Sequence, residues 1–298
     1  MTHPSRRQTP GSQTDIRHAP LGQPTLEPSS VQHVSVTSPV DRPATTESAV
    51  HPCVLIPVYN HERAVVATCR ALERLALPIL LIDDGSNAEC AGVLEALAER
   101  PGVQLLRLAR NGGKGRAVRE GLFHARRLGF THALQVDADG QHDVQSLPPF
   151  IEAARRDPAC LIVGYPHFDH SVPKLRFFAR YITHLWVWLN TLSFELRDTM
   201  CGVRLYPLAH LVPMLEKRRC GDRMEFDTEV LVRWHWRYRR VANLPVRVHY
   251  PQDGVSHFRL WRDNLLMARM HLRLTGGMLR RLPGLLRHRH RAHRRELS

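Results

Sequence analysis

The sequence is short of the features that mark secreted, membrane-spanning and metal-cluster proteins. Its six cysteines form no CxxC pair and show no metal-ligand spacing, which favours a reducing cytoplasmic compartment. The N-terminus has no continuous apolar stretch of the signal-peptide kind, and nowhere do about 18 uncharged apolar residues follow one another. We therefore expect a cytoplasmic protein without a membrane-spanning helix.

Lysine is also scarce, because 39 of the 42 basic residues are arginines. With 28 acidic residues the formal net charge is +14. Arginine suits bidentate capture of phosphates or anionic lipid headgroups, so an anionic partner is expected. The arginines crowd the stretch from Arg269 to Arg295, whereas clustered acids lie in the middle of the chain. A basic tail and an acidic site are therefore expected to be separate features.

The chain divides into three segments by composition. Residues 1–50 are rich in Ser, Thr, Pro, Gln and His without apolar periodicity, which predicts disorder. Residues 51–251 carry regular apolar runs and are expected to form the catalytic domain around one core. Residues 252–298 form a basic extension.

Short apolar runs alternate with amphipathic stretches from Cys53 onward. Strand-like runs separated by helices predict right-handed crossovers and a Rossmann-like, mostly parallel sheet with helices on both faces, an α/β fold. The runs are CVLIPV, ILLI, VQLLRL, ALQV and LIVG, with helices expected over 62–75, 88–100, 115–128 and 146–156. A hydrophobic helix over 173–196, a short strand after Cys201, two helical segments and the strand LPVRVHY complete the expected domain.

Polar loops follow four of the expected strands. Parallel sheets bind ligands beyond the carboxyl ends of their strands, so these loops are predicted to line one crevice. In VDADGQHD, Asp137 and Asp139 project to the same side of the backbone about 7 Å apart and can share a hard cation, Mg²⁺ or Mn²⁺. Such a cation would neutralise a diphosphate leaving group. The alternative is an acidic turn with Gly140 in a left-handed conformation.

Two further motifs lie in the neighbouring loops. One of Asp83 and Asp84 is expected to accept hydrogen bonds from a base or ribose, and the other to cap the next helix. In NGGKG the glycines let the backbone approach a ligand, and Lys114 offers a charge to phosphate or base. The Walker A spacing is absent, which excludes a P-loop.

Four motifs in order, VLIPVYNHERAV, LLIDDGS, NGGKGRAVREGL and VDADGQHD, resemble those of family 2 glycosyltransferases with the GT-A fold. The sequence looks closest to the polyprenyl-phosphate mannosyl- and glucosyltransferase branch, over about Cys53 to Tyr250. The resemblance implies that Asp139, with Asp137, binds Mg²⁺ or Mn²⁺. It implies a UDP- or GDP-sugar donor that is bound by Pro57, Tyr59, Glu62, Asp83, Asp84, Lys114, Asp137 and Gln141. Glu62 is included because His61 occupies the place of the family's usual acid.

The acceptor side is expected in the second half of the domain. RDTMCGVRLY resembles the family segment R-D-x-T-S-G-F-R, with Cys201 for Ser and Val203 for Phe. The resemblance implies that Arg204 lies near a donor diphosphate or an acceptor phosphate. Arg176 and Arg180 share one helix face and are candidates for holding a lipid phosphate, or are a basic edge on a core helix.

MEFDTEVLVRW resembles the acidic segment that follows in this family. In relatives with a hydroxyl acceptor an acid here acts as general base, whereas an ionised phosphate acceptor needs none. Asp227 is the carboxylate predicted for this catalytic role, because it is expected to begin a helix at the rim of the crevice. The alternative is an acid favoured there by the helix dipole. In DGVSHFRLWRDN, His257 is also placed near the site.

From Phe258 onward, apolar residues recur three or four apart with arginines between them. This pattern predicts an amphipathic helix suited to an anionic membrane surface. The alternative is a helix that packs on the domain and ends in a frayed basic turn.

The predicted function is inverting, metal-dependent transfer of a sugar from a nucleotide diphosphate to a lipid acceptor, either polyprenyl phosphate or a lipid-linked hydroxyl. The enzyme, a hexosyltransferase, would be peripheral on the inner face of the cytoplasmic membrane. A role in bacterial glycolipid or pigment-lipid assembly is the alternative within the family. A nucleotidyltransferase would need a Gly- and Arg-rich loop that IPVYNHE lacks. A non-catalytic basic protein that binds nucleic acid or membrane rests on charge alone, and without a reader motif no specific nucleic-acid partner is expected.

Overall fold

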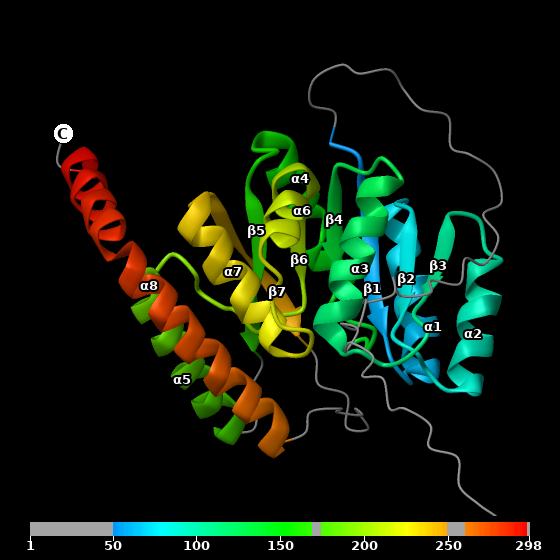
Figure 1. The fold of residues 1–298 in the computed structure, drawn as a ribbon. Helices are drawn as coiled ribbons and strands as arrows, with labels where there is room; N and C mark the ends of the chain where they lie inside the picture. The colour runs from blue at the N-terminus through cyan, green and yellow to red at the C-terminus, as the bar shows by residue number, and fades with distance from the viewer. Residues whose placement is uncertain (1–49, 169–173, 249–259, 297–298) are drawn as a thin grey trace, which may run out of the picture. The chain divides into compact units, whose positions relative to one another are not determined.

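The computed structural model describes residues 50–168, 174–248 and 260–296 (Figure 1). The predicted disordered segment 1–49 and His257 lie outside the described residues, as does the side chain of Arg176.

A seven-stranded sheet forms the centre of the domain, in the order β3-β2-β1-β4-β6-β5-β7. Its strands are β1 (Pro52–Val58), β2 (Ile79–Asp83), β3 (Val103–Arg107), β4 (His132–Gln135), β5 (Leu161–Phe168), β6 (Arg204–Pro207) and β7 (Val241–Val248). Within the described ranges β6 alone runs antiparallel to its neighbours. The predicted α/β class with a mostly parallel sheet is confirmed.

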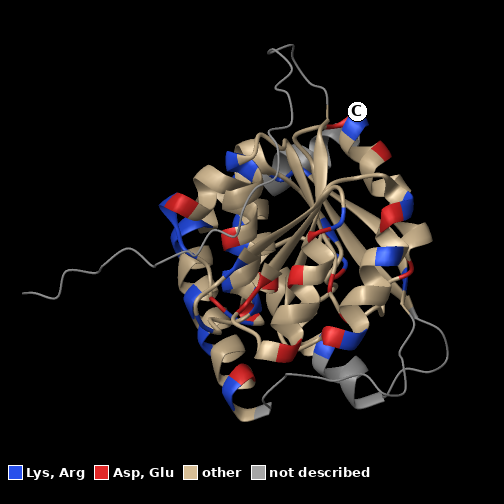
Figure 2. Ribbon diagram, turned by 90° about the vertical axis from the view of Figure 1, so that its right-hand side faces the viewer, with Lys and Arg blue, Asp and Glu red and all other residues tan. Residues whose placement is uncertain are grey.

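Helices cover both faces of the sheet. The α-helices are α1 (Glu62–Leu72), α2 (Ala88–Ala98), α3 (Lys114–Arg127), α4 (Pro148–Arg156), α5 (Lys174–Thr191), α6 (Leu208–Lys217), α7 (Glu225–Arg237) and α8 (Leu260–Glu296). Two 3₁₀ turns, Glu73–Leu75 and Val144–Ser146, adjoin α1 and α4. Helices α1, α2 and α4 pack into one core cluster, and α3, α6, α7 and α8 into the other. Figure 2 shows acidic and basic residues intermixed on the helices of one side.

Strand β1 lies at the centre of both cores. All seven of its residues are buried, as expected for a strand covered on both faces. Its side chains alternate, with Leu55 in the cluster that contains α3 and Val54 in the cluster that contains α1. Gly121 lets α3 approach the sheet closely, because a Cβ there would come within 2.8 Å of side-chain atoms of Leu55 and Ile82.

The second half of the chain extends the sheet and adds α5 and α8, which lie side by side (Figure 1). The predicted C-terminal helix is present and begins at Leu260. Helix α5 ends at Thr191, five residues earlier than expected from the hydrophobic run to Leu196. No helix in the described part of the chain is long and apolar enough to cross a bilayer.

Candidate active site

Four loops meet at the carboxyl ends of β1 to β4, as the parallel topology predicted. Val58, Asp83 and Arg107 are level with one another in register across β1, β2 and β3. On the other side of β1, Leu55 pairs with Gln135, so Asp137 follows the end of β4 at the same edge. The register therefore brings residues from distant parts of the sequence to one edge of the sheet.

The first two loops are joined by Asn60, which has a left-handed backbone conformation (φ 51°). Its amide nitrogen donates to Ser86 Oγ (3.1 Å), and its side-chain oxygen accepts from Asn87 N (2.9 Å). Asn87 in turn caps α2 by accepting from Cys90 N at 2.9 Å. The prediction that Asp83 or Asp84 caps this helix is wrong, because residues 85–87 separate both aspartates from the first turn of α2.

The two aspartates after β2 have different partners. Asp83 is fully buried; it accepts from Ser86 N (2.9 Å) and pairs with Arg107 Nε (2.9 Å). Asp84 accepts from the amides of Gly112 (2.8 Å) and Gly113 (2.7 Å). Burial raises the pKa of Asp84 despite these two hydrogen bonds. Asp84 therefore fixes the glycine loop, and Asp83 faces β3.

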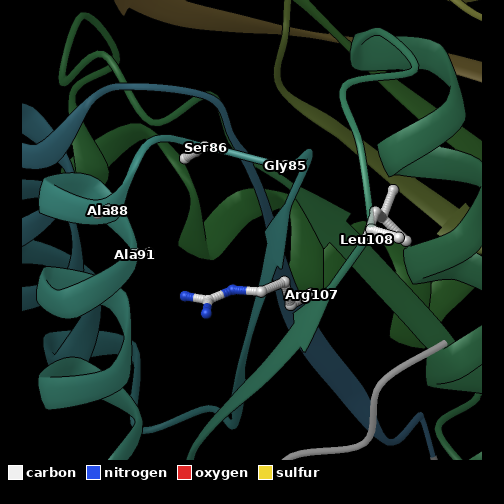
Figure 3. A pocket seen from close by; sticks show the side chains of 7 residues that line it. Gly85, Ser86, Ala88, Ala91, Arg107 and Leu108 are labelled. Atoms are coloured by element: carbon white, nitrogen blue, oxygen red, sulfur yellow. The ribbon is translucent and has the colours of Figure 1, made fainter.

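A cavity of about 360 Å³ lies beside Asp83, between the ends of β2 and β3 and the first turns of α2 (Figure 3). Its lining residues are Gly85, Ser86, Ala88, Ala91, Arg107, Leu108 and Ala109. In Figure 3 the Arg107 side chain extends toward α2, and its Nη1 pairs with Glu95 at 2.8 Å.

Lys114 is at the centre of the charged cluster. Its ammonium lies 2.7 Å from Asp137 Oδ1 and 3.0 Å from Asp227 Oδ2. Burial alone would lower the pKa of Lys114, but the two carboxylates outweigh it and hold that pKa above its usual value. Burial likewise opposes ionisation of Asp137, yet Lys114 and then His142 hold its pKa below the usual range. Lys114 thus links Asp137, which follows β4, to Asp227 of α7, and its predicted contact with phosphate or base stays a prediction.

Asp139 has the opposite electrostatic environment. Its Oδ1 accepts from Gln141 N (3.1 Å), while burial and then the charge of Asp137 raise its pKa. A divalent cation beside Asp137 and Asp139 would offset the free-energy cost of ionising Asp139 in this place. Carboxylate oxygens are the ligands that Mg²⁺ and Mn²⁺ prefer. The described residues contain no group of three or more His, Cys, Asp or Glu side chains that could hold a metal ion. The two carboxylates fit a cation whose remaining ligands are phosphate oxygens and water.

Arg204 holds Asp227 from the other side. Its Nη1 lies 3.2 Å from Asp227 Oδ1 and donates to the Asp227 carbonyl (2.6 Å), while Nη2 donates to Thr199 O (2.8 Å). The side chain is fully buried, with Nε bonded to Cys201 O at 3.1 Å. This placement favours a positioning role for Arg204 over the direct phosphate contact that the resemblance implied.

Asp198 organises the loop before β6, a role that the sequence analysis missed. It accepts from the amides of Met200 (2.8 Å) and Cys201 (2.7 Å) and pairs with Arg180 Nε at 2.6 Å. Gly202, the residue after Cys201, packs against the Asp137 carboxylate, and this contact leaves no space for a Cβ at position 202. The sequence did contain a signal for this role, namely Asp198 within the RDTMCG segment. An acid shortly before a glycine turn is well placed to accept backbone hydrogen bonds.

The structure does not bring every predicted site residue into the charged cluster. Arg180 is committed to Asp198 rather than open to a lipid phosphate. Pro57 is buried within β1, and Tyr59 follows that strand. Glu62 begins α1, and its Oε2 is a buried oxygen without a hydrogen-bond partner. A buried carboxylate oxygen in that state is suited to accepting a hydrogen bond from a ligand.

Comparison with known proteins gives matches along most of the chain. The sequence model described as Glycosyl transferase family 2 matches residues 53–209. An uncharacterised protein of Methanocaldococcus jannaschii is 26% identical over 211 residues, which are 68% of this chain and 90% of that protein. An undecaprenyl-phosphate 4-deoxy-4-formamido-L-arabinose transferase of Edwardsiella ictaluri is 27% identical over 77% of this chain and 69% of its own length.

Further matches come from a eukaryotic relative, a second bacterial transferase and a solved structure. A dolichyl-phosphate beta-glucosyltransferase of Drosophila melanogaster is 27% identical over 69% of this chain and 68% of its own length. The chain spans a third, 33%, of another arabinose transferase of that name, from Sodalis glossinidius. Among solved structures, glucosyl-3-phosphoglycerate synthase from Mycobacterium tuberculosis in complex with Mn²⁺ and UDP-glucose has a TM-score of 0.57 and 14% identity, over 79% of this chain and 85% of that one. This likeness confirms the GT-A type of fold.

Proposed function

The chain belongs to glycosyl transferase family 2 and is a glycosyltransferase, and from that premise we propose that it transfers a hexose from a nucleotide diphosphate sugar to a polyprenyl phosphate, with inversion at the anomeric carbon. Its relatives named for undecaprenyl-phosphate and dolichyl-phosphate substrates support this class of acceptor. The matched regions cover only part of some relatives, so the acceptor is inferred from the site as well.

The observation that carries the proposal is the environment of Asp227. Both of its carboxylate oxygens contact cations, Lys114 at 3.0 Å and Arg204 at 3.2 Å. A carboxylate that accepts a proton from an attacking hydroxyl would have to weaken these two ion pairs. An ionised phosphate needs no base, so the arrangement favours a phosphate acceptor. Asp227 then acts by positioning Lys114.

The donor diphosphate would lie against Asp137, Asp139 and Lys114. Asp137 and Asp139 would hold Mg²⁺ or Mn²⁺, which when bound offsets the negative charge of the leaving diphosphate. Lys114 supplies a fixed positive charge at the same place without reorganising during the reaction. Asp84 holds the glycine loop in position through the amides of Gly112 and Gly113, and the absence of side chains at these glycines would let the backbone approach the ligand.

The nucleotide would extend from this cluster toward the first two strands. Tyr59, Glu62 and Asp83 are assigned to the nucleoside, with Pro57 shaping the end of β1 and Gln141 beside the metal. The cavity next to Asp83 supports this direction, since it is concave and adjoins the loop after β2, one of the two loops assigned to the nucleoside (Figure 3). Either UDP or GDP is compatible with these contacts.

We also propose that the enzyme works on the cytoplasmic face of a membrane, with the basic helix α8 at the lipid surface. The six free cysteines, all buried, support a reducing compartment. The amphipathic pattern of α8 supports contact with anionic lipid.

The first experiment is calorimetric titration of UDP-, GDP- and TDP-sugars with Mn²⁺, with Mg²⁺ and with chelator, on wild type and Asp139→Ala. We expect binding of one donor that requires the metal and is lost in Asp139→Ala. Asp157→Ala is the matched control, because Asp157 lies in the loop before β5 and its carboxylate pairs with Arg240, which directly precedes β7. Absence of donor binding by the folded wild type would contradict the proposal.

The acceptor is tested with the donor so identified. Transfer to polyprenyl phosphate, and none to the corresponding polyprenol or to a glycolipid, is the expected result. Transfer to a hydroxyl acceptor instead would place the enzyme in glycolipid assembly and assign Asp227 as general base. The anomeric configuration of the product tests inversion.

A further inference from the structure

Helix α5 has its hydrophobic side chains on the outside. Among the side chains described on this helix, those of residues 180–191, the exposed ones are all apolar or aromatic: Tyr181, Ile182, Leu185, Trp186 and Leu189. Leu185 is 64% exposed and Ile182 63%. The opposite side of the helix, with His184, Val187 and Asn190, is buried against the domain. The sequence predicted a hydrophobic helix here, and the structure leaves one hydrophobic face of its described part uncovered.

Helix α8 carries a second exposed apolar row. Its members recur at helical spacing along one side: Trp261, Leu265, Leu272, Leu279 and Leu286. Trp261 is 89% exposed. The inner side, which includes Met270 and Leu274, belongs to the core cluster that contains α3 and α7. The outer row is therefore additional to the residues that hold α8 on the domain.

The two rows adjoin each other. Trp186 of α5 stacks on His271 of α8 with ring centroids 5.8 Å apart, and Thr275 Oγ1 donates to Asn190 Oδ1 at 3.0 Å. Because Trp186 belongs to the exposed row of α5 and His271 directly precedes Leu272, the rows form one surface. We call the ten residues of the two rows the α5–α8 face. Figure 1 shows the two helices side by side.

A line of arginines borders this face. Arg262, Arg273 and Arg280 each directly follow a member of the outer row of α8, about 100° further round the helix. Arg273 pairs with Glu229 of α7, whereas no ion pair found among the described side chains involves Arg262, Arg269 or Arg280. The acids of α8 are Asp263, which is buried, and Glu296 at its end. The surface is thus apolar with a cationic edge.

We propose that the α5–α8 face docks on an anionic lipid bilayer, with both helices in the interface and the arginines among the headgroups. An exposed apolar surface of this extent marks an interaction site. Tryptophan and tyrosine favour the membrane interface, and arginine next to an apolar row attracts anionic lipid. A second copy docked through the same face would bring further arginines rather than acids to meet these arginines, so charge complementarity favours lipid over symmetric self-association.

Docking in this way would place the active site near the membrane. Arg180 of α5 pairs with Asp198, which holds the Cys201 amide next to the glycine that packs on Asp137. The docked helix is therefore only a few contacts from the charged cluster. The inference rests on the proposed lipid acceptor for its purpose, but lipid binding itself can be measured without donor or acceptor.

The test is co-sedimentation of the full chain with vesicles of phosphatidylcholine containing phosphatidylglycerol, compared with phosphatidylcholine alone. We expect binding to the anionic vesicles that weakens about tenfold or more in Ile182→Ser/Leu185→Ser, since each buried aliphatic side chain contributes substantially to partitioning. Arg269→Glu/Arg280→Glu should also weaken it. Arg126→Glu/Arg127→Glu, on exposed positions at the end of α3, makes the same change in net charge and should bind like wild type.

Four outcomes would overturn the inference. Three of them are no binding by wild type, wild-type binding by the α5 variant, and equal loss in the α3 control. The fourth is dimerisation that the α5 substitutions abolish, without vesicle binding, which would assign the face to a second copy. Calorimetric donor binding is measured on each variant in parallel. Variants of the α5–α8 face that still bind the donor but no longer bind vesicles support docking. Absence of donor binding by wild type that does bind vesicles contradicts the proposed function and leaves the docking inference standing.

Discussion

Gly202 packs against the carboxylate of Asp137 so closely that no side chain larger than hydrogen fits at position 202. The loop before β6 thereby closes one side of the place where a metal and a diphosphate are proposed to bind. This contact joins the second half of the chain to the acidic motif after β4, although the two positions are 65 apart in sequence numbering.

Gly202→Ala should lower kcat/KM by about 10²-fold, because a Cβ would displace Asp137, and misplacement of about 1 Å costs activity of that order. Gly92→Ala is the matched control, since nothing lies within 4 Å of a Cβ at that position in α2. We expect Gly92→Ala to keep full activity and equal or higher Tm. Steady-state kinetics and thermal melts check both variants; equal activity of the two would contradict the role given to Gly202.

Lys114→Met should lower kcat/KM by about 10²-fold or more, because it removes a fixed positive charge from the diphosphate site. It also leaves Asp137 and Asp227 without their shared cation, so Tm should fall. Lys217→Met, on an exposed lysine at the end of α6, should change neither quantity. Donor titration by calorimetry should show the loss as weaker binding in Lys114→Met, and unchanged donor affinity would argue against the phosphate role.

Asp227→Asn separates a positioning role from general-base catalysis. With a phosphate acceptor we expect a loss smaller than the roughly 10²- to 10⁴-fold of a missing base, and a pH–rate profile of unchanged shape. The physical reason is that the asparagine keeps the volume of the side chain but holds Lys114 less firmly. Disappearance of the acidic limb of the profile in this variant would instead identify Asp227 as the base.

Asp198 should make stability depend on acid pH. Burial opposes its ionisation, but the hydrogen bond from His184 and the charge of Arg180 hold the pKa of Asp198 below its usual value. A depressed pKa in the folded state gives stability that is present above the unfolded pKa of about 4 and is lost as pH falls through the folded value. At pH 7, Asp198→Asn should lower Tm by on the order of 10 °C.

The difference in Tm between wild type and Asp198→Asn should shrink as pH falls below about 4. Asp157→Asn removes a partly exposed carboxylate of a surface ion pair and should change Tm little at any pH. Melting curves between about pH 3 and about pH 7, a range that includes the unfolded pKa of an aspartate at about 4, measure both differences in Tm. A gap that widens toward acid pH would contradict the assigned ion pair.

The local sequence pattern predicted the order of β1 to β5 and their intervening helices. Strand-like runs and amphipathic stretches are local signals, so the printed sequence was sufficient for α1 to α4 to within a few residues. The cap of α2 was missed because Asn87 competes with two nearby aspartates, and only the path of the loop decides between them.

Sequence alone determined the fold class, the edge of the sheet at which the polar loops meet and the amphipathic character of α8, because hydrophobic periodicity and parallel crossovers follow from neighbouring residues. Tertiary structure decided which charges meet: Lys114 with Asp137 and Asp227, and Arg204 buried behind them. It also decided that the apolar face of α5 lies outward. Pairing and burial depend on residues distant in sequence, and a helix apolar on several sides does not specify which side the core will cover.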